Sequence, residues 1–277
     1  MRQVTRSGTV YVGISGWTYP GWRGDFYPAG LPHRRELEYV GERLSTVEIN
    51  GSFYSLQRPD SYRRWRGEVP PGFVFAVKGG RFITHLKRLR DVEVPLANFF
   101  ASGVLALGAT LGPVLWQLPE RLAFDQAVVG DFLALLPRTT SAAAELASRH
   151  DDKVPDDRAL TTAESDAPLR HALEFRHPSF VSEAAYALLR KHDVATVVAD
   201  SAGRWPRVFE VTSDLVYVRL HGDRELYASG YSARSLDEWA SRCRDWVADG
   251  RDVHVYFDND AKGHAPHDAL ALQERLA

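Results

Sequence analysis

Short runs of β-branched and aromatic residues alternate with amphipathic stretches along the whole chain of 277 residues. We predict a strand for each run, at residues 10–15, 46–50, 73–78, 113–117, 172–176, 196–200, 216–221 and 253–258. Helical patterns separate the runs, for example at 37–44, 125–136, 182–192 and 236–249. Parallel neighbours need such crossover helices, and eight strands are the number that closes a barrel. The alternation therefore predicts one closed parallel (β/α)8 barrel domain over residues 1–277.

Two serines mark expected helix starts. Ser182 followed by Glu183 suits an N-cap, and Ser235 with Glu238 three residues later fits a capping box. Residues 139–170 are richer in Ala, Asp and Thr than their surroundings. We interpret this stretch as a helix followed by a long polar excursion, and not as a domain boundary.

The composition argues against several classes of protein. The formal net charge of -2 and the pI near 6.6 give no basic field, so nucleic acid is not an expected partner. No apolar run is long enough to cross a bilayer, and residues 1–8 hold no apolar signal core, so we expect a cytoplasmic protein with no membrane partner. The single cysteine, Cys243, lies on the apolar stripe of a predicted helix and should be buried.

Side chains of a strand alternate between two faces, and in a barrel one face meets the helices while the other meets the interior. One parity is apolar in most of the predicted strands, as in Val10, Val12, Ile14, Val47, Ile49, Phe73, Phe75, Val77, Leu173, Phe175, Val216, Val218, Leu220, Val253, Val255 and Phe257. The opposite parity ends in polar groups, namely Ser15, Glu48, Asn50, Lys78, Gln117, Glu174, Arg176, Asp200, Arg219, His221, Tyr256 and Asp258. Barrel enzymes carry their chemistry at the C-terminal ends of the strands. We therefore predict a functional cavity there. The alternative is an internal ion-pair network that fills the barrel mouth.

Four of these residues are the candidate catalytic groups: Glu48, Glu174, His221 and Asp258. Glu48 and Glu174 belong to the second and fifth strands, so they should face each other across the barrel. Two carboxylates in unlike environments can serve as an acid and a base. Equally, both can be counter-ions for the inward cations Lys78, Arg176 and Arg219.

Those three cations suit a small anionic or sugar-like ligand, because Arg offers a planar fork to phosphate or carboxylate and Lys a point charge. A metal site built from His85, His177, His221 or His264 with Glu48, Asp200 and Asp258 is the alternative. The interleaved cations compete for the same carboxylates, so we predict no metal. The sequence also lacks a Walker loop, a dinucleotide glycine fingerprint, a His-Glu-x-x-His pair and a Gly-x-Ser-x-Gly elbow, and we predict no cofactor.

Most of these polar residues fall within seven ordered motifs that resemble the YecE-like family of unknown function, DUF 72. The motifs begin with Gly13-Ile14-Ser15-Gly16-Trp17, Thr46-Val47-Glu48-Ile49-Asn50 before Phe53-Tyr54, and Thr84-His85. They continue with residues 111–119, Leu173-Glu174-Phe175-Arg176-His177-Pro178, Arg219-Leu220-His221-Gly222 and Tyr256-Phe257-Asp258-Asn259. The resemblance covers almost the whole chain and implies a TIM-type barrel, but no reaction. Many relatives read Phe-Asn-Asn at the last motif, where this chain has Asp258, which adds a possible negative charge to the cavity.

Residues at the rim complete the candidate ligand contacts: Trp17, Tyr54, His177 and Asn259, beside Ser15, Asn50, Lys78, Gln117, Arg176, Asp200 and Arg219. The leading hypothesis is a small-molecule enzyme, a hydrolase, lyase or isomerase, acting on a polyhydroxylated or phosphorylated substrate. A non-catalytic ligand-binding barrel is the second hypothesis. A metal-dependent phosphodiester hydrolase acting on nucleic acid is the third.

Overall fold

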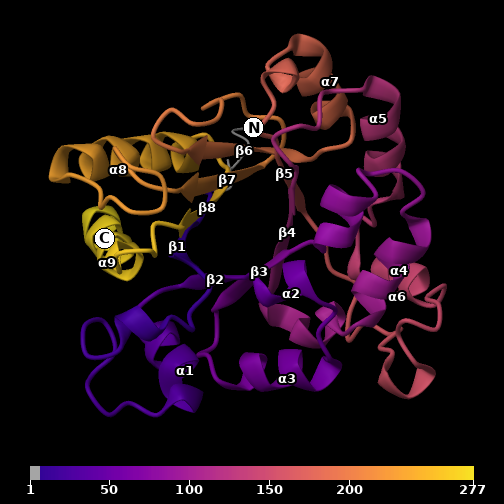
Figure 1. Ribbon diagram of the computed structural model, residues 1–277, viewed down its shortest axis with the longest axis horizontal. Coiled ribbons are helices and arrows are strands. Elements are labelled where there is room, and N and C mark those ends of the chain that lie inside the picture. The colour runs from indigo at the N-terminus through magenta and orange to yellow at the C-terminus, as the bar shows by residue number, and fades with distance from the viewer. Residues whose placement is uncertain (1–6) are drawn as a thin grey trace, which may run out of the picture.

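The computed structural model describes residues 7–277, and over these residues eight parallel strands close into a barrel in chain order (Figure 1). The strands are β1 (Val10–Ser15), β2 (Thr46–Ile49), β3 (Val74–Lys78), β4 (Leu111–Gln117), β5 (His171–Glu174), β6 (Ala195–Asp200), β7 (Leu215–Leu220) and β8 (Asp252–Phe257). The last strand closes the ring by pairing with the first, with Val10 opposite Val253. The predicted closed (β/α)8 TIM-type barrel is confirmed.

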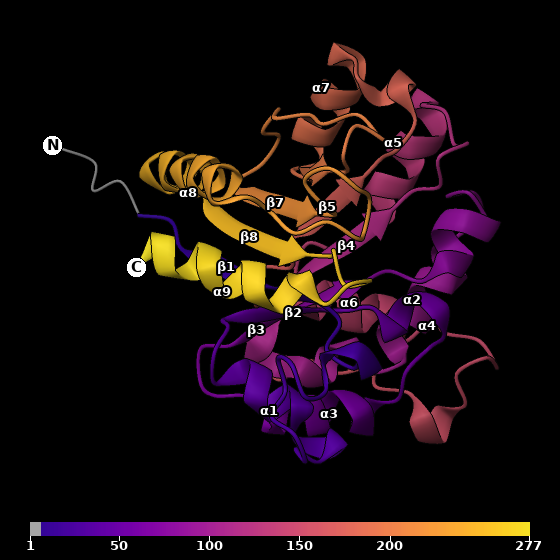
Figure 2. The ribbon, with the colours of Figure 1, turned by 60° about the vertical axis from the view of Figure 1, so that its left-hand side comes forward.

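Helices surround the strands (Figure 1). They are α1 (Glu36–Gly41), α2 (Gly51–Tyr54), α3 (Pro59–Gly67), α4 (Glu93–Ala101), α5 (Gln126–Leu135), α6 (Thr140–Ala147), α7 (Glu183–Lys191), α8 (Ala233–Ala248) and α9 (His264–Leu276). Figure 2 shows the arrowheads of β7 and β8 pointing away from the C-terminal end of the chain, toward the C-terminal mouth of the barrel.

The helix starts agree with the sequence in one of two cases. Ser182 caps α7 by accepting a hydrogen bond from the backbone N–H of Ala185, as predicted. The prediction for Ser235 is wrong, because α8 begins one turn earlier and Ser232 is its N-cap. The Ser235 hydroxyl instead donates to the carboxylate of Asp223 at 2.9 Å.

Two apolar clusters lie on the two sides of the barrel wall. The larger one joins the helices to the outward strand residues, including Val47, Ile49, Leu173, Phe175, Val216, Val218, Val253 and Val255. The smaller one fills the barrel interior with Ala76, Leu115, Ala172, Ala195, Val197, Ala199, Leu215, Tyr217 and Tyr256. The predicted parity is therefore confirmed for the outward residues. Four of these interior residues are alanines, which leave room for the larger interior side chains and for long polar ones at the mouth.

Within residues 7–277, no single helix is long and apolar enough to span a membrane. The bent pair of α4 and the segment Val104–Thr110 reaches the required length and composition only when taken together, across a bend of 59°.

Candidate functional site at the barrel mouth

Arg219 is the centre of a buried polar cluster at the C-terminal mouth. It comes from β7 and has no exposed surface. Its Nε and Nη2 donate to the two carboxylate oxygens of Glu48 on β2, at 3.1 and 2.9 Å. Its Nη1 donates to Glu174 on β5 at 2.7 Å, and Nη2 also contacts Asp258 at 3.0 Å. One guanidinium thus binds three carboxylates from three parts of the barrel.

Neighbouring polar groups occupy much of the remaining capacity of these carboxylates. Glu48 also accepts hydrogen bonds from Ser15 at 2.5 Å and from the hydroxyl of Tyr217 at 2.6 Å. Glu174 accepts from Gln117 at 3.1 Å and from Arg176 at 3.0 Å. Glu48 and Glu174 therefore act as counter-ions in this structure, and their predicted use as an acid and base pair stays a prediction.

Asp258 differs from the other two carboxylates in its exposure. About 14% of its side chain is exposed, against 0% for Glu48 and Glu174. Nδ1 of His221 lies 2.9 Å from Asp258 Oδ2, and Nε2 lies 3.8 Å from Glu174 Oε1. His221 is fully buried, and neither ring nitrogen has a well-aligned hydrogen-bond partner among the described residues.

The cations hold two of the carboxylates in the ionised form. Burial acts to raise the pKa of Glu174, but the charges of Arg219 and Arg176 prevail and hold that pKa well below its usual value. For Asp258, burial is likewise outweighed by Arg219 and His221, and the pKa is lowered. Both side chains are therefore bases or counter-ions at neutral pH, and neither can donate a proton.

Two aromatic residues cover one side of this cluster. Trp205 packs edge-on against His221, with ring centroids 5.5 Å apart, and its ring lies 3.6 Å from the guanidinium carbon of Arg176. Tyr227 also packs edge-on against His221, at 5.4 Å, and its hydroxyl accepts from Arg176 at 3.4 Å. Tyr227 has a φ of 63°, a left-handed conformation that costs on the order of 1 kcal/mol in a residue with a side chain.

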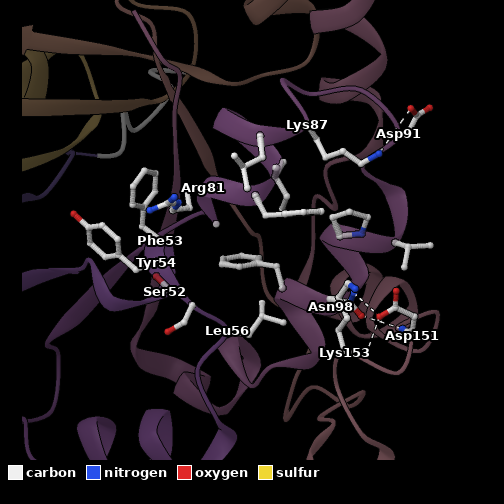
Figure 3. Close-up of a pocket in the computed structure, with 18 residues that line it drawn as sticks. Ser52, Phe53, Tyr54, Leu56, Arg81, Lys87, Asp91, Asn98, Asp151 and Lys153 are labelled. Carbon is white, nitrogen blue, oxygen red and sulfur yellow. Dashed lines mark hydrogen bonds and ion pairs between the residues drawn. The ribbon is translucent and has the colours of Figure 1, made fainter.

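A groove of about 750 Å³ lies beside the mouth, over the loops that follow β2 and β3 (Figure 3). Large apolar side chains line it and are exposed, namely Tyr54, Leu56, Phe82, Leu86 and Val94. Arg81, Lys87 and Lys153 add positive charge, while Asp91 and Asp151 add negative charge. Phe53 belongs both to this groove and to the mouth, because its ring also lies 4.5 Å from Nζ of Lys78.

Most of the predicted site residues converge at the mouth. They are Ser15, Glu48, Asn50, Lys78, Gln117, Glu174, Arg176, Arg219, His221 and Asp258. Asn50 joins the group by donating from its amide to the hydroxyl of Ser15 at 3.1 Å. The shared strand parity therefore brings together side chains that are distant in the sequence.

Other predicted contacts lie elsewhere. The inward assignment of Asp200 is wrong: β6 turns Ala195, Val197 and Ala199 inward, so the opposite parity of Asp200 points to the helices, where it pairs with Arg207 at 3.2 Å. His177 accepts from the backbone N–H of Ser179 and caps the short helix Pro178–Phe180.

Three further candidates are peripheral. Asn259 is buried and donates to Ser229 and Asp268, which holds the loop after β8. Trp17 packs edge-on against Trp65 at 5.4 Å, in a shallow pocket that Asn50 also lines. Tyr54 is 70% exposed and lies in the groove.

Sequence reasoning missed Tyr217, Trp205 and Phe53. Tyr217 has the same parity as Arg219, two residues earlier in β7, so the parity rule could have found it. Trp205 lies in a loop and Phe53 in the short helix α2, so strand parity gives no prediction of where their side chains point. Among residues 7–277, no group of three His, Cys, Asp or Glu side chains is placed to hold a metal ion.

Comparison with known proteins agrees with this architecture. The model of the family described as "Protein of unknown function DUF72" matches residues 11–277. The UPF0759 protein YunF of Bacillus subtilis is 24% identical over 96% of this chain and 94% of its own length. The UPF0759 protein YecE of Escherichia coli is 29% identical over 44% of this chain and 46% of its own length.

Solved structures give the same result. A DUF72 family protein from Thermotoga maritima superposes with a TM-score of 0.76 at 25% identity, covering 97% of this chain and 99% of that one. A second DUF72 family protein, from Enterococcus faecalis, superposes with a TM-score of 0.72 at 17% identity, over 97% of this chain and 95% of that one, and shows the shared fold alone.

Proposed function

The chain belongs to the DUF72 family, and we propose that it is an enzyme acting on a small polyhydroxylated or phosphorylated substrate at the barrel mouth. The observation that carries this proposal is the unequal exposure of a balanced charge cluster. Glu48, Glu174 and Arg219 are fully buried, while Asp258 and Arg176 each expose part of the side chain, 14% and 13%. The carboxylate of Asp258 and the guanidinium of Arg176 are thus both accessible to a ligand, next to charged groups that are fully buried.

Arg176 is the proposed anchor for an anionic group. Its guanidinium stacks on Trp205 and bonds to Glu174 through Nε, while Nη2 makes a long hydrogen bond of 3.4 Å to the Tyr227 hydroxyl. Nη1 and the weakly bound Nη2 are the donors proposed for phosphate oxygens. Glu174 keeps Arg219 and Gln117 as partners if Arg176 turns toward a ligand. Binding an anion at Arg176 therefore leaves no buried carboxylate unpaired.

Asp258 and His221 are the proposed proton-handling pair. Asp258 stays ionised, so it can accept a hydrogen bond from a substrate hydroxyl. His221 lies directly behind it and has a ring nitrogen without a well-aligned partner, so it can hold a proton taken from that hydroxyl.

Calorimetric titration with inorganic phosphate and with glucose 6-phosphate tests the anchor. We expect binding that weakens as salt rises and falls at least tenfold, about 1.4 kcal/mol, in Arg176→Met. Arg204→Met is the matched control, because Arg204 is exposed and pairs with Glu120 on the same rim. Equal phosphate binding in wild type and Arg176→Met would show that the anchor is wrong.

Turnover tests the proton pair. Across a panel of sugar phosphates and polyols, Asp258→Asn should abolish any turnover and retain phosphate binding. The full ion pairing of Glu48 and Glu174 supports the second candidate, a non-catalytic ligand-binding barrel. Phosphate binding at Arg176 without turnover on any member of the panel would favour that candidate.

A further inference from the structure

Lys78 is a buried amine without a close counter-ion. It ends β3 on the inward parity, and only about 8% of the residue is exposed. Among the residues that the structure describes, its Nζ forms no salt bridge. The carboxylates that attract its charge, Glu48, Glu174 and Asp258, are all bound by Arg219. The ring of Phe53 lies 4.5 Å from Nζ and supplies an aromatic face instead.

The backbone around Lys78 is held firmly. The hydroxyl of Ser52 donates to the carbonyl of Lys78 at 2.7 Å, and the N–H of Gly79 donates to Leu115 at 2.8 Å. A side chain at Gly79 would lie 2.2 Å from the ring of Trp116, so only glycine allows this close packing. The backbone from which the amine projects is therefore held by β4 and by α2.

The groups that face the amine come from every side of the mouth: Arg219 from β7, Glu48 from β2, Glu174 from β5, Asp258 after β8 and His85 after β3. Burial and the charge of Arg219 lower the pKa of Lys78, against the opposing effect of the carboxylates. His85 packs edge-on against the same Phe53 ring, at 5.1 Å. Burial and nearby cations lower the pKa of His85 to about 4, so it is no source of positive charge at neutral pH.

We propose that Lys78 is a nucleophile that forms an imine with the aldehyde or ketone carbon of a small substrate. This inference rests on the proposed function and narrows the substrate to carbonyl compounds. The neutral amine forms a carbon–nitrogen bond to the carbonyl carbon. The carbonyl oxygen leaves as water with the two protons that the nitrogen gives up, and no redox partner is needed. Lysines desolvated beside another cation are suited to this chemistry.

Reductive trapping tests this inference on the full chain. Protein is mixed with glyceraldehyde 3-phosphate, or with uncharged glyceraldehyde, and sodium cyanoborohydride is added to reduce any imine to a stable secondary amine. Peptide mass mapping then compares Lys78 with Lys87, Lys153, Lys191 and Lys262. We expect labelling of Lys78 at pH 7 at least tenfold faster than at any of these lysines, three of which are exposed and one partly exposed.

The pH dependence separates a neutral amine from ordinary surface labelling. Labelling of an ordinary exposed lysine falls roughly tenfold for each pH unit between 9 and 7, because the free lysine amine has a pKa near 10.4. Labelling of Lys78 should fall far less over this range. Lys78→Met removes the amine without adding a charge and should lose the selective adduct. Labelling confined to the other lysines in wild type would overturn the inference.

The two probes distinguish this inference from the proposed function. If phosphate binds at Arg176 but Lys78 is not labelled, only the imine is wrong. If Lys78 is labelled equally fast by both probes and phosphate does not bind, the imine stands and the anionic anchor is wrong.

Discussion

Arg219 and Glu48 are 171 residues apart in the sequence, yet two hydrogen bonds of 2.9 and 3.1 Å join them across the barrel interior. Neither side chain has any exposed surface. β7 and β2 are not neighbours in the sheet, so this pair joins two separate parts of the barrel wall at the mouth. A buried charge pair of this kind stabilises the fold only while both partners are present.

Replacing Glu48 by Gln should therefore lower the free energy of unfolding by about 3–5 kcal/mol, because Arg219 loses its bidentate partner. Urea unfolding followed by tryptophan fluorescence measures the change. Glu38→Gln is the control, since Glu38 and its partner Arg35 are exposed and little change is expected. An unchanged midpoint for Glu48→Gln would contradict the structural role of the pair.

His171 should make the fold sensitive to mild acid. It is fully buried, Trp116 donates to its Nδ1 at 3.2 Å, and Nε2 donates to the carbonyl of Pro137 at 2.7 Å, which fixes the neutral ring. Burial lowers its pKa to about 4, against about 6.5 in an unfolded chain. Below pH 6.5 the unfolded chain therefore binds a proton that the folded chain does not, and stability falls as pH falls.

Between pH 7 and pH 5 this histidine should account for about 2 kcal/mol of lost stability. His171→Gln should flatten the pH dependence by that amount in urea titrations at the two pH values. Val114→Ala, a variant in the same part of the core without an ionisable change, should keep the wild-type slope. Equal slopes in wild type and His171→Gln would disprove the assignment.

Cys243 should be inert in the folded protein. It is completely buried in α8, and burial raises the pKa of its thiol to about 12. An aromatic disulfide reagent should therefore modify the native thiol only as fast as the protein unfolds. In about 6 M guanidinium, where the chain is unfolded, the reaction should be immediate. Rapid native labelling would show that α8 opens at low cost.

The purified, dialysed protein should contain far less than one transition-metal ion per chain. Both oxygens of Glu48 accept hydrogen bonds from Arg219, and Asp258 is bound by the same guanidinium. A metal would have to displace these cations. Elemental analysis gives the answer, and about one ion per chain that is lost in Glu48→Ala would contradict this expectation.

The fold could be predicted because the sequence alternates in two ways: strands alternate with helices along the chain, and apolar residues alternate with polar ones within most strands. Strand parity separates Val216, Val218 and Leu220 from Arg219 and His221, and the barrel then places the polar set at one mouth. Asp200 shows where this fails. Before Asp200, β6 shows no alternation of apolar and polar residues, so its parity could not be read from hydrophobicity, and Ala195 and Ala199 in fact turn inward.

The place of Trp205 over the site could not be predicted for a different reason. Trp205 reaches the mouth through an irregular loop whose course depends on single contacts, such as the hydrogen bond from Trp205 Nε1 to Glu120 at 2.7 Å. The positive φ of Tyr227 has no sequence signature, since non-glycine residues rarely adopt it. The ion pairing of Glu48 and Glu174 also depends on distances that spacing alone does not give.

Trp205 provides the last prediction, which depends on the proposed anchor. Its ring lies 3.6 Å from the guanidinium carbon of Arg176 and restrains that side chain in place. Trp205→Leu removes the aromatic face and leaves every charge unchanged. Phosphate affinity should fall roughly fivefold to tenfold, the effect of about 1–1.4 kcal/mol of lost cation–π contact and ordering.

The salt dependence identifies the cause of that loss. In Trp205→Leu the dependence of phosphate affinity on salt should match wild type, because Arg176 still carries its charge, whereas Arg176→Met should lower it. Glu120→Gln is the control, since it changes the acceptor of Trp205 Nε1 and keeps the stacked ring. If Trp205→Leu binds phosphate as wild type does, Arg176 needs no support from Trp205, and its orientation is set by its hydrogen bonds to Glu174 and Tyr227.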